Sequence, residues 1–119
     1  MDRRVQRIIV LMGEAKCREV TLCEMAQAVN LTAPHLCRLF KAEVGLPPLQ
    51  YLKHLRMREA VGLLESTFLS VKEVMLRVGF RDESHFVRDF KAMFGLTPTQ
   101  YRADLQNNDG RVSDEIKNR

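Results

Sequence analysis

The chain has 119 residues, of which 45% are hydrophobic and 29% are charged, and its formal net charge is +4. This composition fits one compact domain or two small subdomains, and it argues against intrinsic disorder over most of the length. The positive charge is compatible with nucleic-acid binding, but many basic proteins bind none. No apolar run approaches the roughly 20 residues that span a bilayer, and no signal-peptide cleavage site is visible, so we expect a cytoplasmic protein without a membrane partner.

The cysteines argue against both a disulfide framework and a metal site. Cys17, Cys23 and Cys37 make an odd count without a Cys-x-x-Cys pair, which is typical of a reducing compartment. His35 and Cys37 supply only two metal ligands at a poor spacing. We therefore expect no metal and no cofactor.

The N-terminal segment predicts an opening helix that covers the first part of the core. Its apolar residues recur at helical spacing: Val5, Ile8, Ile9 and Met12.

The next segment, Thr21–Val29, has a second copy at Ser70–Val78. Each copy begins with a hydroxyl residue that is followed three positions later by glutamate, the pattern of a capping box. Each then carries apolar residues at i, i+3, i+4 and i+7, which is typical of a short amphipathic helix. An internal repeat of this kind organises the whole fold.

A turn follows each of these helices. Asn30 and Gly79 come directly after the last apolar position, and these residue types best tolerate a left-handed backbone. The copies are 49 residues apart up to this point and 50 residues apart beyond it, so one residue is inserted in the second turn.

A second helix is predicted after each turn, with Thr32 and Asp82 as N-caps. The segment His35–Lys41 matches His85–Lys91. A helix, a short turn and a second helix form a helix-turn-helix unit. Two such units in register are far more specific than one.

The remaining segments complete an all-α fold. Residues 48–65 read as a central helix, with Leu52, Leu55, Ala60, Leu63 and Leu64 on its apolar face. About 18 residues give a helix of roughly 27 Å. Residues near 99–105 form a last short helix. We therefore predict helix-turn-helix subdomains at 1–47 and 66–105, joined by the helix 48–65 and followed by a flexible polar tail at 106–119.

The segment Val78–Lys91, followed by Phe94–Arg102, resembles the AraC/XylS family of bacterial transcription regulators, because its glycine, aromatic, Arg-x-Phe-Lys and Pro-x-x-Tyr-Arg positions have the family spacing. The resemblance covers about residues 4–103. It implies seven helices, promoter binding in the nucleoid and contact with RNA polymerase. Members commonly carry a sensor or effector domain before this part, so a C-terminal fragment and a free-standing regulator both stay open.

Three positions depart from the family pattern. Met75 replaces a usual small alanine, Asn30 replaces a usual turn glycine, and Pro34 lies early in the first recognition helix. Proline is tolerated in a first turn but cannot donate to a base. The first recognition helix is therefore expected to read fewer bases than usual.

The second helix of each unit separates into a core face and a DNA face. Leu36 and Phe40, like Phe86 and Phe90, are spaced to point inward. The predicted base contacts on the other face are Arg38, Arg88, Cys37, Pro34, Glu83, Ser84 and Val87. The predicted DNA-backbone contacts are Lys41, Lys91, Thr32, His85 and Arg56.

The side-chain chemistry suggests the role of each contact. Arginine fits the guanine O6 and N7 acceptors, lysine meets phosphate, glutamate accepts from cytosine, and valine touches a thymine methyl. Other interpretations stay open. Arg88 can pair with Glu83 or Asp89, Glu83 can serve the helix dipole alone, and Arg56 and Arg58 can belong to a solvated face.

The leading hypothesis is a regulator, not an enzyme, that binds duplex DNA as a monomer through two adjacent major grooves. One alternative is a DNA-repair alkyltransferase fragment, in which Cys17 between Lys16 and Arg18 would be the reactive thiol, although no further constellation supports it. Another alternative is a module that binds only a protein partner. Pro34 and the Asp82-Glu83 pair support it.

Overall fold

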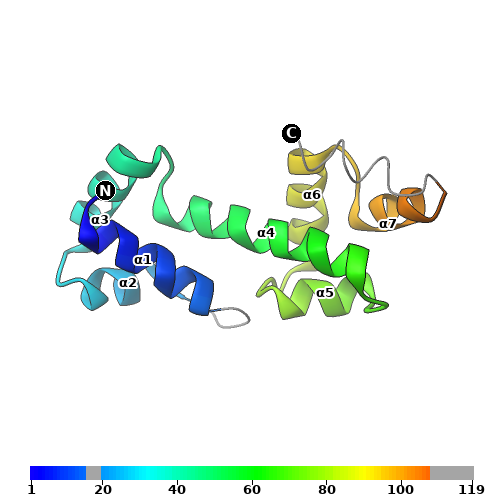
Figure 1. The fold of residues 1–119 in the computed structure, drawn as a ribbon, viewed down its shortest axis with the longest axis horizontal. Helices are drawn as coiled ribbons and strands as arrows, with labels where there is room; N and C mark the ends of the chain where they lie inside the picture. The colour runs from blue at the N-terminus through cyan, green and yellow to red at the C-terminus, as the bar shows by residue number, and fades with distance from the viewer. Residues whose placement is uncertain (16–19, 108–119) are drawn as a thin grey trace. The chain divides into compact units, whose positions relative to one another are not determined.

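The computed structural model describes residues 1–15 and 20–107, and all regular structure in these ranges is helical (Figure 1). The predicted all-α fold with seven helices is confirmed. Cys17 and its neighbours Lys16 and Arg18 lie outside the described residues, as does most of the predicted tail. The helices are α1 Arg3–Glu14, α2 Leu22–Ala28, α3 Ala33–Val44, α4 Pro48–Ser66, α5 Val71–Arg77, α6 Glu83–Phe94 and α7 Pro98–Asn107.

Two compact units make up the chain, and the division between them falls within α4. We refer to Met1–Arg56 as the first unit and to Met57–Arg119 as the second unit. The central helix ends at Ser66, one residue beyond its predicted end, and α7 continues through Asn107, two residues beyond Leu105.

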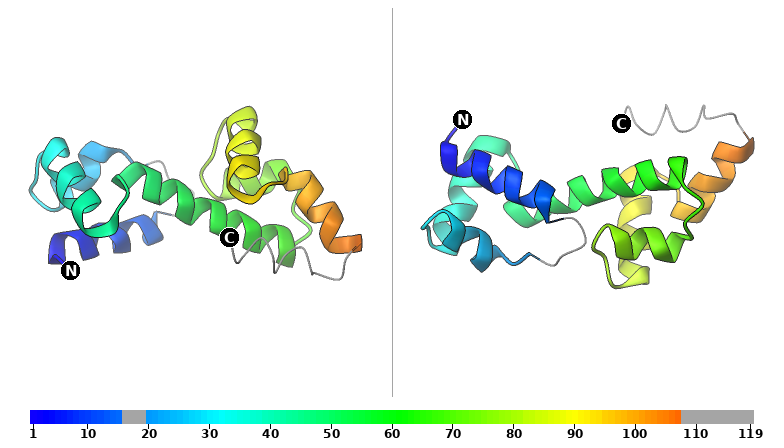
Figure 2. Two further views of the ribbon diagram at one scale, coloured as in Figure 1. Left: turned by 90° about the horizontal axis from the view of Figure 1, so that it is seen from above. Right: turned by 60° about the horizontal axis from the view of Figure 1, so that its bottom comes forward.

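The first unit is built on three mutually contacting helices, α1, α2 and α3 (Figure 2). The expected inward positions of α1 are confirmed for Val5, Ile8 and Met12, which are buried, while Ile9 is partly buried. Burial of this apolar face is the main force that holds such short helices together. Its buried core consists of Val5, Ile8, Met12, Met25, Ala26, Val29, Leu36, Phe40 and Leu52.

The second unit has a core rich in aromatic rings. Phe90 lies at its centre, with ring centroids 4.7 Å from Phe94, 6.0 Å from Phe86 and 6.0 Å from Tyr101. These are edge-on or tilted arrangements, the favoured geometries for aromatic pairs. The buried core consists of Met57, Ala60, Val61, Leu64, Val74, Met75, Val78, Phe86, Phe90, Phe94 and Tyr101.

The predicted N-cap residues of α2 and α5 are confirmed, and the reciprocal bond of the predicted capping box is found at α5. The Ser70 hydroxyl accepts from Glu73 N at 3.0 Å, and the Glu73 carboxylate accepts from Ser70 N at 2.9 Å, which completes a capping box. In the first unit the Thr21 hydroxyl accepts from Glu24 N at 3.1 Å and donates to the Glu24 carboxylate at 3.3 Å. Both helices therefore begin at the residue that the sequence predicts.

The turns after α2 and α5 share one backbone geometry, the Schellman motif. Leu31 N donates to Ala26 O and Asn30 N donates to Gln27 O; the second unit repeats both bonds one for one, from Phe80 N to Met75 O and from Gly79 N to Leu76 O. The left-handed residue of this motif is Asn30 in one copy, with φ 58°, and Gly79 in the other, with φ 97°. The predicted left-handed turn positions are confirmed.

The two recognition helices also begin and end alike. Thr32 accepts from His35 N at 3.3 Å, and Asp82 accepts from His85 N at 3.0 Å, so both predicted N-caps are confirmed. Pro34 lies in the first turn of α3, where its missing N–H leaves no bond unmade, and α3 continues without a break. Each helix ends at a left-handed glycine, Gly45 or Gly95.

Two side chains of α7 tie it to the end of α4 in the second unit. Tyr101, which is fully buried, donates its hydroxyl proton to the Glu65 carboxylate. The Arg102 guanidinium donates to the carbonyls of Leu64, Thr67 and Leu69. Leu64 O is one of the last carbonyls of α4, which a helix terminus leaves free, whereas Thr67 O and Leu69 O belong to the connection between α4 and α5.

Candidate nucleic-acid interface

In the first unit, α3 presents one polar face to solvent. Leu36 and Phe40 are fully buried, as predicted, and fix the helix on α1 and α2. On the other side of the helix, Arg38 and Lys41 are exposed and Cys37 is partly buried. The remaining predicted contacts of this unit, Thr32 and Pro34, are exposed at the start of the helix.

In the second unit, α6 presents the corresponding face. Phe86 and Phe90 are fully buried, as predicted. Arg88 and Lys91 are exposed, at the positions that match Arg38 and Lys41, and Val87 is partly buried. The predicted contacts near the start of the helix, Glu83, Ser84 and His85, are all exposed. Each unit thus presents an exposed arginine, an exposed lysine and exposed residues at the start of its second helix.

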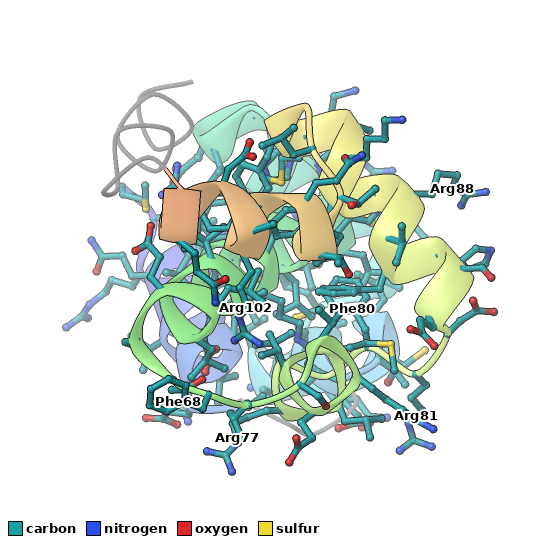
Figure 3. The ribbon with its side chains drawn as sticks, turned by 90° about the vertical axis from the view of Figure 1, so that its right-hand side faces the viewer. Phe68, Arg77, Phe80, Arg81, Arg88 and Arg102 are labelled. Carbon is teal, nitrogen blue, oxygen red and sulfur yellow. The ribbon has the colours of Figure 1, made fainter. Side chains whose placement is uncertain are left out.

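The interpretation of Arg88 as an ion-pair partner has some support. Its Nε lies 3.8 Å from an Asp89 carboxylate oxygen, and the Arg88 side chain is 70% exposed. This distance is too long for a direct hydrogen bond, and exposed pairs of this kind contribute about 0–1 kcal/mol. The pairing is therefore weak enough for Arg88 to exchange it for a nucleic-acid acceptor. Figure 3 shows Arg88 projecting from α6 into solvent.

The start of α6 is acidic, unlike the start of α3. The hydrogen bond from His85 N lowers the pKa of the Asp82 carboxyl below its ordinary value, so Asp82 is ionised at neutral pH. Glu83 adds a second carboxylate in the first turn. In the first unit the N-cap is the neutral Thr32, and the first turn of α3 has no acidic residue. The starts of α3 and α6 therefore differ in local charge.

Arg56, also a predicted DNA-backbone contact, lies on α4 and not on a recognition helix. It is partly buried in the first unit, and its guanidinium donates to Ala15 O at 3.4 Å. This bond gives Arg56 a structural role within that unit.

Two exposed residues of the second unit were missed by the sequence analysis. Arg81 is exposed directly before the N-cap of α6, and the one-residue offset between the copies could have identified it. Phe68 is fully exposed between α4 and α5, beside a hollow of about 370 Å³. The hollow is lined by Leu64, Glu65, Thr67, Phe68, Arg102, Leu105 and Gln106.

Within the ranges that the structure describes, no group of three or more His, Cys, Asp or Glu side chains could hold a metal ion. Cys23 is a free exposed thiol, and Cys37 is a free, partly buried one. None of the described helices is both long and apolar enough to cross a membrane.

Comparison with known proteins identifies the family. The chain matches the model of a helix-turn-helix domain over residues 25–104. It is 36% identical over 103 residues to the HTH-type transcriptional regulator MtrA of Neisseria gonorrhoeae, covering 87% of this chain and 34% of that protein. It is 32% identical over 106 residues to the HTH-type transcriptional activator AarP of Providencia stuartii, covering 88% of this chain and 78% of that protein.

A solved structure with similar geometry is bound to nucleic acid. The DNA-binding domain of AdpA, crystallised with a target DNA, has a TM-score of 0.85 against this chain. The two are 25% identical, and the match covers 92% of this chain and 99% of that one. The chain spans about a third of the length of several of the curated relatives that it matches. Similar solved structures include one described as an AraC-type DNA-binding protein. The chain belongs to the AraC/XylS family of transcription regulators, and its two helix-turn-helix units form a DNA-binding domain of that family.

Proposed function

We propose that the chain binds an asymmetric promoter site by inserting α3 and α6 into adjacent major grooves. The observation that carries this proposal is the doubled face. Each recognition helix buries two apolar side chains one turn apart and leaves an arginine and a lysine exposed at matching positions, Arg38 with Lys41 and Arg88 with Lys91. A single chain with two such helices needs no dimer to reach two grooves.

The two arginines are proposed as the principal base-reading residues. A guanidinium fits the paired O6 and N7 acceptors of guanine, and such a contact contributes about 1–3 kcal/mol of discrimination. Lys41 and Lys91 lie one turn further along and are proposed to meet phosphates, which fix position without reading sequence. The base contacts of Pro34, Cys37, Glu83, Ser84 and Val87, and the backbone contacts of Thr32, His85 and Arg56, belong to the same proposal.

In the whole protein, this domain is proposed to place a regulator at a promoter, where it contacts RNA polymerase. AarP, which this chain matches over most of its length, is described as a transcriptional activator. Most of the other relatives are far longer than the match, so a sensor or effector domain is proposed to accompany this one in the full-length protein.

The first test is a binding selection on random duplex DNA at fixed salt. It compares wild type with Arg38→Ala and Arg88→Ala, and uses Arg7→Ala, an exposed arginine of α1, as the matched control. We expect an enriched site with two motifs about ten base pairs apart. Each recognition-helix variant should relax one motif, while Arg7→Ala should leave both unchanged.

The selection also separates the alternatives. One enriched motif, relaxed by only one of the two variants, would mean that the other unit clamps the DNA backbone without reading it. No enrichment by the wild type would contradict the proposal and favour a module that binds only a protein partner. Pro34 no longer supports that alternative, because α3 accommodates it in the first turn.

A further inference from the structure

We propose that Arg81 binds a DNA phosphate beside the start of α6, as an anchor that the second unit has and the first unit lacks. This inference rests on the proposed DNA binding. It assigns a role to the single residue by which the two helix-turn-helix units differ in length.

The turn geometry identifies Arg81 as the inserted residue. In the first unit, Leu31 closes the Schellman motif and also lies directly before the N-cap Thr32. In the second unit these two positions are occupied by different residues, because Phe80 closes the motif and Arg81 precedes the N-cap Asp82. The connection between the helices is four residues long in one copy and five in the other.

The insertion releases one side chain from the core. Leu31 is partly buried and packs against the core of the first unit. Phe80 takes over this packing in the second unit, with its ring centroid 5.2 Å from that of Phe86. The additional residue therefore has no packing role to fill, and Arg81 is exposed.

The position of Arg81 suits a phosphate contact. It lies just outside the first turn of α6, and the N-terminal end of a recognition helix is the part that enters the major groove between phosphate strands. Figure 3 shows Arg81 below the start of α6, with its guanidinium directed into solvent. Neither a hydrogen bond nor an ion pair ties it to the residues that the structure describes.

The negative charge at the start of α6 explains why a positive residue is useful beside it. Asp82, held ionised by its bond from His85 N, and Glu83 place two carboxylates at the start of α6, where they repel a nearby phosphate. The start of α3 has no such carboxylates. An arginine next to the acidic pair offsets this repulsion only in the unit that needs it.

The test measures how the dissociation constant for the selected DNA site depends on salt concentration. In a plot of log Kd against the logarithm of the salt concentration, removing one phosphate contact lowers the slope by about 0.9. We expect this decrease for Arg81→Ala, with an equal loss of affinity for matched and mismatched sites. Arg81→Lys should keep the wild-type slope, because it retains the charge.

Arg77→Ala is the matched control. It also removes one exposed arginine of the second unit, but Arg77 lies on α5 near Glu73, whose pKa it helps to lower, so its charge already acts within the protein. It should leave the slope unchanged. The melting temperatures of Arg81→Ala and Arg81→Lys should equal that of wild type, since Arg81 is exposed.

The outcomes separate this inference from the proposed function. A wild-type protein that shows no salt-dependent DNA binding would overturn both. Tight wild-type binding with an unchanged slope for Arg81→Ala would overturn the phosphate anchor alone. A change in the selected sequence at a single base position, with no change in slope, would also overturn it, because Arg81 would then read a base.

Discussion

At the scale of single residues, the same turn is built from two different amino acids. Asn30 and Gly79 close equivalent Schellman motifs with positive φ. Glycine adopts this conformation without steric cost, whereas other L-residues pay roughly 1–2 kcal/mol and asparagine is among the most tolerant. Residue type alone therefore predicted the turn, but not the difference in stability between the copies.

Substitutions at these two positions should differ in sign. Gly79→Ala should destabilise the protein by about 1–2 kcal/mol, because alanine is strained at this φ. Asn30→Gly should be stabilising or neutral, because it relieves strain while loosening the unfolded chain. Urea denaturation measures both effects. A loss of stability in Asn30→Gly as large as that in Gly79→Ala would contradict the prediction, because glycine would then not relieve strain at this position.

The ionised N-cap of α6 predicts an acid sensitivity. The folded pKa of Asp82 is lowered below its ordinary value of 3.8 by the hydrogen bond from His85 N. A lowered folded pKa contributes stability that is present above the unfolded pKa and is lost as pH falls through the folded pKa. The melting temperature should therefore fall below about pH 4, and Asp82→Asn, a cap that does not titrate, should show a smaller fall. Identical pH profiles would contradict this role.

At the scale of elements, helix starts were predictable and the attachment of α7 was not. Hydroxyl and acidic caps are local signals, so Thr21, Thr32, Ser70 and Asp82 were identified from sequence. The Thr97–Gln100 capping box, with bonds of 2.9 and 3.1 Å, was missed although its pattern is local too. The carbonyl acceptors of Arg102 belong to backbone far along the chain, and no residue type reveals them.

The attachment of α7 predicts a strong effect on stability for Arg102, a family-motif residue that lies outside both recognition helices. Arg102→Ala should destabilise the second unit by about 1.5–3 kcal/mol, because charge-assisted bonds to the end of α4 are lost. Arg102→Lys should recover little of the lost stability, since a compact ammonium group cannot reach the three carbonyls that the planar guanidinium bonds. Hydrogen exchange of α5 to α7 measures this directly. Wild-type protection in Arg102→Ala would contradict the structural role.

At the scale of the whole molecule, the internal repeat predicted two units, but it did not predict that one helix serves both cores. Leu52 of α4 belongs to the core of the first unit, whereas Met57, Ala60, Val61 and Leu64 belong to that of the second. The predicted apolar face included Leu52, Ala60 and Leu64 and omitted Met57 and Val61. Two apolar faces that follow one another along the same helix do not give a single clear periodicity. The division within α4 could therefore not be predicted from the sequence. The DNA contacts remain predictions, because the sequence of a recognition helix does not by itself identify the bases that it would contact.

Separate cores predict separate losses of protection. Phe86→Ala removes a fully buried ring from the second unit, at a typical cost of about 3–5 kcal/mol. Amide hydrogen exchange should then accelerate in α5, α6 and α7 while α1, α2 and α3 stay protected. Phe40→Ala should give the reverse pattern. Uniform acceleration in both variants would mean that the chain unfolds as one cooperative block.

Because α3 and α6 begin and end alike, the sequence of one helix can be placed in the position of the other. Both are 12 residues long, both start after a side-chain cap, both bury an i, i+4 apolar pair and both stop at a left-handed glycine. Grafting Ala33–Val44 in place of Glu83–Phe94 therefore keeps the length and both ends of the helix, but it replaces the buried rings of Phe86 and Phe94 with the smaller side chains of Leu36 and Val44. If each recognition helix reads one half of the site, as proposed, a chain with two copies of α3 would select the same base motif in both halves, so the target could be changed one half at a time.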